Sequence, residues 1–413
     1  MLFVQNKTKN SVFDKENARV KGGVMMNIAI FGGTMDPFHC GHLQIVEHLC
    51  DLFDLVLLVP NNVSPFKGEE LLVDKEIRYQ MLCLQVERMR AQNAQRGDKI
   101  CIERCEMDRE PPSYTIDTLL YLKKKHPKDG LYLCLGSDAY EGFAGWKDSQ
   151  KILELCNLLL VPRQGASVDC EGVPVFEGGH QKLSKLGVPI LQVSSSEARV
   201  DIAFGCFDKL PPVIAKSIQE QNLYADYAGI VKQYPSYGLS EGRIGHIHRV
   251  AQTALQIALN VHGVVRHKVV MAALLHDIAK RTPQAQIVLT KQQEKFLLAL
   301  SPNIVHAFLG AEIAQQKFGV SDLDVLNAIR HHTTGRAEMS DLEKIIYLAD
   351  MVEPRRTMPG VESVRDLALN GRLDEAMCIG LGQTIDNLRM RGEKIDARTT
   401  QAYAHFQRLT QAK

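Results

Sequence analysis

The sequence predicts an α/β domain with a parallel sheet, followed by an all-helical domain. Up to about residue 224, short apolar runs alternate with helical patterns, and each run ends in a polar or glycine-rich loop. That alternation is typical of an open parallel sheet with its site at the strand C-termini. After residue 225 no further strand–loop–helix unit occurs, and amphipathic helices follow one another. The 413 residues are enough for two or three domains.

Composition is that of an ordinary soluble globular protein, with 45% hydrophobic and 23% charged residues. The formal net charge of +1 gives no argument for a nucleic-acid partner or an anionic membrane surface, and an RNA-binding adaptor would need a basic patch. No apolar run approaches the length of a membrane helix. We therefore expect no membrane partner, and a homo-oligomer is an open alternative.

Ten cysteines occur without a regular framework, so we interpret them as reduced thiols of a cytoplasmic protein. Residues 1–25 are polar and mildly basic and lack the apolar core of a signal peptide. We expect them to form a disordered leader or to result from an upstream start codon.

The first predicted strand, residues 27–31, runs into the small residues Gly32, Gly33 and Thr34, and then into a helix. Such a turn lets a backbone approach a ligand closely and presents helix N–H groups to a phosphate. His39 and His42, at the start of that helix, can donate to triphosphate oxygens that gain charge during nucleotidyl transfer. Two surface histidines on a first helical turn are the alternative, which the glycines and the later motifs disfavour.

Four more strands are predicted at residues 55–59, 100–102, 131–135 and 158–161. Residues 74–90 are predicted to form an amphipathic helix. Its inner face would hold Ile77, Met81, Leu84 and Val86. Another helix follows residue 112, where Ser113 or Thr115 can cap it.

Four segments resemble one enzyme family. GGTMDPFHCGH is similar to the GGTFDPxHxGH pattern of the HxGH nucleotidyltransferases. PSYTIDTL, GSDAY followed by a tryptophan, and VSSSEAR resemble the SYTxDTL, GxD…W and ISSTxIR segments of nicotinate-nucleotide adenylyltransferases. The resemblance covers about residues 27–224. It implies a Rossmann-like domain at residues 26–224 that transfers AMP from ATP to nicotinate mononucleotide with Mg²⁺. Another HxGH transferase, acting on pantetheine phosphate, is the rival that the later segments disfavour.

This resemblance also implies site residues. The ATP-binding set would be Gly32, Gly33, Thr34, His39, His42, Gly136, Asp138, Ser195, Ser196 and Arg199. His39, His42 and Arg199 would be catalytic. The set for nicotinate mononucleotide would be Lys67, Ser113, Tyr114, Thr115 and Trp146. Trp146 could instead be a core aromatic, but glycines at positions 142 and 145 favour a loop at a site.

The helical half carries ionisable residues on apolar helices, where they are costly unless they are paired or bind a metal. In chain order they are His248, His276, Asp277, His306, His332 and Asp350. Imidazoles and carboxylates in such a series suit one or two divalent metals.

Four segments here, LLHDIAK, HAFLGA, AIRHHTTGR and YLADMVEPRR, resemble HD-domain phosphohydrolases that cleave diadenosine tetraphosphate symmetrically into two ADP. The resemblance covers about residues 239–406 and implies an all-α HD domain at residues 225–413, with iron as the expected transition metal. It implies that the six residues just named are the metal ligands and that Asp277 is the catalytic bridge between two metals. Lys280, Arg330 and Arg336 would contact phosphate. Rival interpretations are a different nucleotide substrate, or a silent nucleotide-binding domain that regulates the first half.

Overall fold

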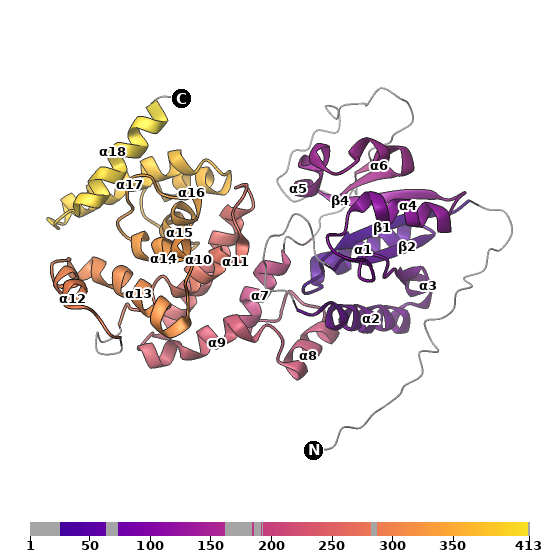
Figure 1. Ribbon diagram of the computed structural model, residues 1–413, viewed down its shortest axis with the longest axis horizontal. Coiled ribbons are helices and arrows are strands. Elements are labelled where there is room, and N and C mark those ends of the chain that lie inside the picture. The colour runs from indigo at the N-terminus through magenta and orange to yellow at the C-terminus, as the bar shows by residue number, and fades with distance from the viewer. Residues whose placement is uncertain are drawn as a thin grey trace, which may run out of the picture.

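The computed structural model describes residues 25–62, 73–161, 184–185, 191, 193–281 and 287–411. Figure 1 shows an α/β part in indigo and magenta and a helical part in orange and yellow. The predicted fold class is therefore confirmed for both halves.

The α/β part is built on a parallel sheet with strand order β3-β2-β1-β4-β5-β6. Its strands are β1 (Asn27–Gly33), β2 (Leu55–Pro60), β3 (Ile100–Ile102), β4 (Gly130–Gly136), β5 (Asn157–Val161) and the short β6 (Ser184–Lys185). The five strands predicted from the sequence are present, and β6 is added to them. Strand order reverses between β1 and β4, so their carboxyl ends form the crevice where such sheets bind ligands.

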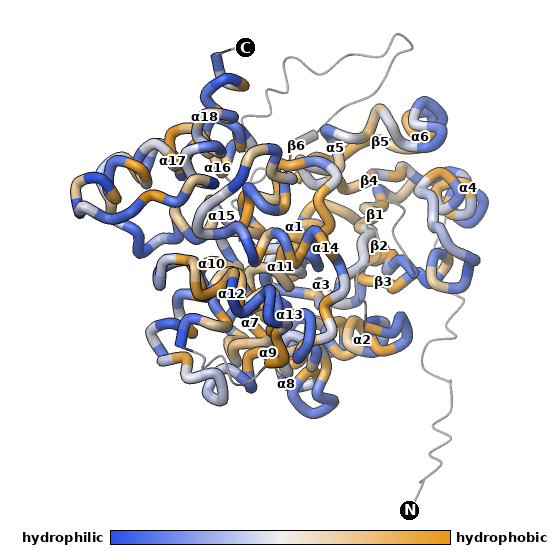
Figure 2. The backbone as a smooth tube through the Cα atoms, turned by 60° about the vertical axis from the view of Figure 1, so that its left-hand side comes forward, coloured by the Kyte–Doolittle hydropathy of each residue, from blue (hydrophilic) through white to orange (hydrophobic). Residues whose placement is uncertain are grey.

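Helices cover both faces of this sheet, because alternate residues of each buried strand point to opposite sides. Ala29 and Phe31 pack in one cluster with α1 (Cys40–Leu52) and α2 (Lys75–Gln92). Ile28 and Ile30 pack in another with α4 (Thr115–Lys125) and α6 (Ser149–Leu155). The short elements α3 (Ala94–Gly97), α5 (Ser137–Glu141) and η1 (Phe143–Gly145) complete this part. Figure 2 shows hydrophobic strands between helices of mixed character.

Two local predictions in this part are wrong. The inner face of α2 holds Met81 and Val86, but Leu84 is 40% exposed, and the polar Arg78 is buried although it was not predicted to be. The second error is the cap of α4. Tyr114 occupies the N-cap position without a side-chain hydrogen bond, and Ser113 donates to the carbonyl of Glu106 instead (3.1 Å).

The second part consists of helices and the loops between them, with no strand among its described residues. Its elements are α9 (Ala225–Gln233), η3 (Tyr234–Tyr237), α10 (Glu241–Ala258), α11 (Arg266–Leu275), α12 (Lys291–Leu298), α13 (Pro302–Phe318), α14 (Leu323–His331), α15 (Asp341–Val352), α16 (Val361–Leu369), α17 (Leu373–Met390) and α18 (Ala397–Gln411). Serine or threonine begins several of these helices, as Ser240 does for α10 by accepting from the N–H of Arg243.

Helices α7 (Ser195–Ala203) and α8 (Pro212–Gln221) connect the two parts, between the sheet and the bundle in Figure 1. Val200 and Ala203 of α7 belong to the same hydrophobic core as α10 and α11. The domain boundary predicted after residue 224 falls between α8 and α9 and stays a prediction. Since α7 contributes to the second core, the two parts share a packed interface.

Among the described residues no helix is both long and apolar enough to cross a bilayer. Nine cysteines in that part of the chain are free thiols, as expected from their irregular spacing.

Candidate active sites

The first site lies at the carboxyl ends of β1 and β4. A Cβ placed on Gly33 or Gly136 would meet no atom of the described residues within 4 Å, so packing against those residues does not require glycine there. Gly41 differs, since a Cβ would lie 2.8 Å from the carbonyl oxygen of Leu191 and 3.2 Å from the His39 ring. The glycine of HxGH is therefore required by the fold, whereas the two strand-end glycines leave open space above the sheet.

His39 and His42 form a reciprocal cap at the start of α1. His39 Nδ1 accepts from the backbone N–H of His42 (3.3 Å), and His42 Nδ1 accepts from that of His39 (3.2 Å). The rings stack with centroids 3.6 Å apart. Because each Nδ1 is an acceptor, the neutral tautomer carries its proton on Nε2. Both imidazoles are thus prepared as Nε2–H donors.

The start of α7 meets the turn that follows β1. Ser194 and Glu197 cap the helix, and Ser195 Oγ donates to the carbonyl of Pro37 (3.1 Å). Arg199, on the first turns of α7, donates from Nη1 to the carbonyl of Asp36 (2.6 Å) and to its Oδ2 (3.2 Å). The structure therefore brings two segments about 160 positions apart to one place, as the predicted ATP set requires.

The predicted nicotinate mononucleotide residues lie around the start of α4 and the loop after α5. Tyr114 and Trp146 are both partly buried against the same hydrophobic cluster, and Trp146 also contacts the Phe143 ring at 5.5 Å. Thr115 is the first residue of α4. Lys67 and the side chain of Asp138 lie outside the described residues. The half-buried position of Trp146 suits a site wall better than a core.

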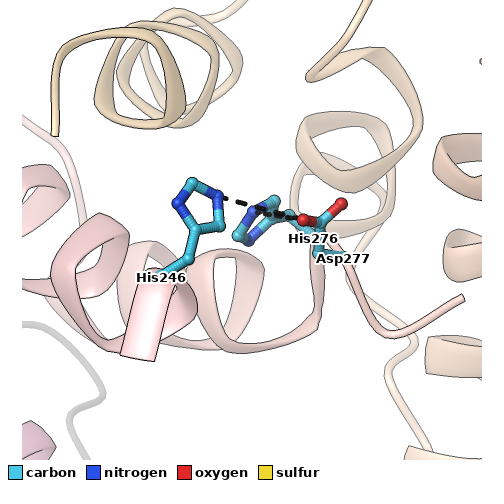
Figure 3. A group of neighbouring side chains, drawn as sticks. All are labelled: His246, His276 and Asp277. Atoms are coloured by element: carbon cyan, nitrogen blue, oxygen red, sulfur yellow. Dashed lines mark ion pairs between the residues drawn. The ribbon is translucent and has the colours of Figure 1, made fainter. Parts of the chain in front are cut away.

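The second site is a cluster of imidazoles and carboxylates at the centre of the helical part. Five helices contribute, and each gives one or two residues. The members are His246 on α10, His276 and Asp277 after α11, His306 on α13, His332 after α14 and Asp350 on α15. Figure 3 shows the imidazoles of His246 and His276 beside the Asp277 carboxylate.

Asp277 is the shared member of this cluster. Its Oδ1 lies 3.3 Å from His306 Nε2 and 3.7 Å from His332 Nε2. Its Oδ2 lies 3.6 Å from His276 Nε2 and 3.9 Å from His246 Nε2. Each carboxylate oxygen therefore faces its own pair of imidazoles, and Oδ2 also accepts from Arg243 Nη1 (2.7 Å).

Contacts made by Nδ1 orient three of the imidazoles in the cluster. His276 Nδ1 and His332 Nδ1 each lie 2.7 Å from a backbone carbonyl oxygen, and His246 Nδ1 lies 3.2 Å from Glu353 Oε1. Such partners fix the tautomer so that Nε2 is left for a metal. Within the described part of the chain, His276 Nε2 and Asp277 Oδ1 are buried and make no hydrogen bond. These donors fit a divalent transition metal.

Electrostatics keep His276, His306 and Asp277 in the forms that bind metals at neutral pH. Burial lowers the pKa of His276 and of His306 to about 4, so both imidazoles are neutral. Burial opposes ionisation of Asp277, but the neighbouring His276 and the nearby imidazoles of His306 and His332 hold its pKa well below the usual range. Neutral imidazoles around a carboxylate are the states in which these groups bind metals.

The prediction of His248 as a ligand is wrong. Its Nε2 hydrogen-bonds to Asp201 Oδ1 (2.7 Å) and its ring stacks on Phe204 (4.4 Å), both at the contact with α7. Residues two positions apart on a helix are separated by about 200° around its axis, so His246 and His248 face opposite sides. His246 is in phase with the buried Val250 and Ala254, a signal in the sequence that would have selected it.

A cavity of about 320 Å³ opens beside the cluster at His246. Four cationic side chains line it, namely Arg243, Lys280, Arg281 and Arg356. Lys280 is one of the predicted phosphate contacts, and the other three cations were not predicted. The remaining two predicted contacts are not in the lining. Arg336 forms a bidentate pair with the buried Glu343 (2.7 Å), and Arg330 bonds to Asn327 and Glu312.

Both halves match known families. Residues 30–201 match the cytidylyltransferase-like family and residues 243–355 match the HD domain family. A probable nicotinate-nucleotide adenylyltransferase of Clostridium tetani is 32% identical over 207 residues, which cover 48% of this chain and all of the relative. A symmetrical bis(5'-nucleosyl)-tetraphosphatase of Bacillus subtilis is 38% identical over 160 residues, covering 38% of this chain and 85% of the relative. The first half of the chain belongs to the nicotinate-nucleotide adenylyltransferase family, and the second half belongs to the family of symmetrical bis(5'-nucleosyl)-tetraphosphatases.

One relative has the same two-part organisation. A protein of Mycoplasma pneumoniae named probable nicotinate-nucleotide adenylyltransferase/Ap4A hydrolase is 28% identical over 339 residues, covering 79% of this chain and 88% of that protein. The cytidylyltransferase-like match spans the strand-end glycines, HxGH and the Ser-Ser-Glu-Ala-Arg segment. The HD match spans all six members of the cluster, from His246 to Asp350.

Proposed function

We propose that the chain is a bifunctional enzyme. The first half transfers AMP from ATP to nicotinate mononucleotide, giving nicotinate adenine dinucleotide and pyrophosphate. The second half hydrolyses diadenosine tetraphosphate to two ADP. The names of the relatives that match each half support the substrates, and the side chains described above support the chemistry.

In the first reaction, a phosphate oxygen of the mononucleotide is already ionised near pH 7 and attacks the α-phosphorus of ATP. No general base is needed, so catalysis consists of alignment and of stabilising charge on the phosphates. His39 and His42 donate from Nε2 to the triphosphate, and Arg199, Ser195 and Ser196 at the start of α7 support the same group. Bound Mg²⁺ would supply further charge neutralisation.

The orientation of the two HxGH imidazoles carries this proposal. Their mutual caps fix both rings with Nε2–H as the donor, next to the open strand-end turns of Gly33 and Gly136. Trp146, Tyr114 and Thr115 would hold the pyridine ring of the mononucleotide on the other side of β4. Lys67 and Asp138 are retained as proposed contacts from the family resemblance.

In the second reaction, the cluster of His246, His276, Asp277, His306, His332 and Asp350 would hold one or two divalent metals, for which we propose iron. A metal bound there supplies Lewis acidity and lowers the pKa of a coordinated water. Arg243, Lys280, Arg281 and Arg356 would bind the polyphosphate in the neighbouring cavity. The two oxygens of Asp277, each facing two imidazoles, carry this proposal.

Both activities would operate in the cytoplasm, because the free thiols of the described part suit a reducing compartment.

One assay of the full-length protein tests both proposals. Purified enzyme is given ATP with nicotinate mononucleotide, nicotinamide mononucleotide or pantetheine phosphate. In a separate assay it is given diadenosine tetraphosphate, and the products of all mixtures are resolved by chromatography. We expect nicotinate adenine dinucleotide from nicotinate mononucleotide and only ADP from diadenosine tetraphosphate, with hydrolysis abolished by a chelator and restored by iron. ATP plus AMP as products, or metal-independent hydrolysis, would refute the second proposal. Failure to form a nicotinate dinucleotide would refute the first.

A further inference from the structure

A buried polar cluster lies directly beneath the first site, and its members come from three distant segments. Asp36 follows β1, Arg199 is on α7, and Tyr224 stands where the chain passes from the first half to the second. All three side chains are buried, with residue exposures of 0%, 5% and 9%. Ionisable groups are this well buried only when their partners satisfy them.

The Asp36 carboxylate is held on both of its oxygens. Oδ2 accepts from Arg199 Nη1 (3.2 Å), and Oδ1 accepts from the hydroxyl of Tyr224 (2.7 Å). Arg199 Nη1 also donates to the Asp36 carbonyl (2.6 Å), while Nη2 donates to Ser196 Oγ (3.1 Å). The tyrosine therefore fixes the plane of the carboxylate, and the carboxylate fixes the guanidinium of Arg199.

Tyr224 is itself rigidly held. Its ring packs with Ala198 of α7 and with Ile214 and Ile218 of α8 in one hydrophobic cluster. Its backbone is left-handed (φ 59°), an uncommon conformation for a residue with a Cβ that persists where surrounding contacts enforce it. Burial, together with the Asp36 carboxylate, raises the pKa of Tyr224 well above its usual value. The phenol thus stays protonated and remains the donor.

We infer that Tyr224 is a positioning residue for adenylyl transfer, acting through Asp36 to aim the Arg199 guanidinium at the phosphates. The inference rests on the proposed function of the first half. Without the hydrogen bond from Tyr224, the Asp36 carboxylate could rotate and carry the Arg199 guanidinium with it. With Oδ1 held by Tyr224, the carboxylate keeps its plane and therefore keeps the guanidinium in place. Tyr224 directly precedes α9, so the arginine is tied to the point at which the second half begins.

The test removes only the hydroxyl. Tyr224→Phe should lower kcat for nicotinate adenine dinucleotide formation on the order of tenfold, with a smaller change in KM, because a slightly misplaced group costs transition-state stabilisation. Tyr227→Phe is the matched control, since it removes another phenolic hydrogen bond, a partly buried one to His267 Nδ1 (2.8 Å), from the first turn of α9. The control should keep wild-type kcat, and both variants should keep the wild-type melting temperature within a few degrees.

A second comparison separates positioning from general loosening of the structure. In an Arg199→Ala background, Tyr224→Phe should cause no further loss of kcat, because the residue through which it acts is gone. Equal losses in both backgrounds, or a wild-type kcat in Tyr224→Phe alone, would overturn the inference. A wild-type protein that forms no nicotinate dinucleotide would instead refute the proposed function, so the two failures are distinguishable.

Discussion

The two sites of this chain are built in different ways. The first is assembled from loops at the ends of parallel strands and from the N-termini of α1 and α7, and each of these segments is a short motif, such as the one that holds His39 and His42. The second takes one or two side chains from each of five helices. A site of loops is specified by short motifs, whereas a site of converging helices is specified by which face each helix turns inward.

Because of that difference, a sequence-based prediction of ligands is more easily wrong at the helical site. His246 and His248 differ by two positions on α10, yet one enters the cluster and the other contacts α7. His246→Ala should lower diadenosine tetraphosphate hydrolysis by roughly 10³-fold, since a metal contributes several kcal/mol of transition-state stabilisation. Metal content by elemental analysis should fall with it.

His248→Ala is the matched control for that variant. It should keep both metal and hydrolysis and lose only stability, by about 1–2 kcal/mol, because a partly buried hydrogen bond to the Asp201 carboxylate is lost. Denaturant unfolding measures that change. If His248→Ala lost its metal and His246→Ala kept it, the helix phase described above would be wrong.

The orienting groups of the second site offer a finer test. Glu353 accepts from Arg249 Nε (2.6 Å) and lies 3.2 Å from His246 Nδ1, so it holds that imidazole without entering the cluster. Glu353→Gln should weaken metal affinity about 10–100-fold, measured by competition with a chromogenic chelator. Adenylyl transfer should not change. An unaltered affinity would mean that the carboxylate does not orient His246.

The smallest expected effect is at the first site and concerns the KM for nicotinate mononucleotide. Trp146→Ala should raise KM for nicotinate mononucleotide by about tenfold, because stacking and burial of an aromatic ring contribute about 1–2 kcal/mol. KM for ATP should change much less. Steady-state kinetics with each substrate varied in turn decide this, and equal increases in both constants would make Trp146 a structural residue.

Much of the α/β half could be predicted from the sequence because buried parallel strands are short continuous apolar runs. What could not be predicted depends on distant backbone. Arg78 is buried on α2 because its guanidinium donates to the carbonyls of Thr34 (2.7 Å), Asn61 (2.8 Å) and Asn62 (2.9 Å), which belong to the loops after β1 and β2. No motif marks those acceptors, so hydropathy alone does not predict that Arg78 is buried.

In the helical half the motifs located the cluster but not its surroundings. Arg243 and Arg356 were missed because they come from helices and loops that only tertiary packing brings to the cavity, where they contact Asp277 Oδ2 (2.7 Å) and Asp350 Oδ1 (2.6 Å). Arg336 pairs with Glu343, seven residues further along the chain at the start of α15, and is not in the cavity lining, so its role as a phosphate contact stays a prediction. Charge alone does not tell a phosphate contact from an internal ion pair.

The central claim, that one chain holds two separate active sites, is tested most directly by assaying two variants for both reactions. His42→Ala should lower kcat for nicotinate adenine dinucleotide formation by about 10²-fold, while hydrolysis of diadenosine tetraphosphate stays at the wild-type rate. Asp277→Ala should abolish hydrolysis and bound metal and leave dinucleotide formation intact. Loss of both activities in either variant, with the fold retained by circular dichroism, would contradict the account.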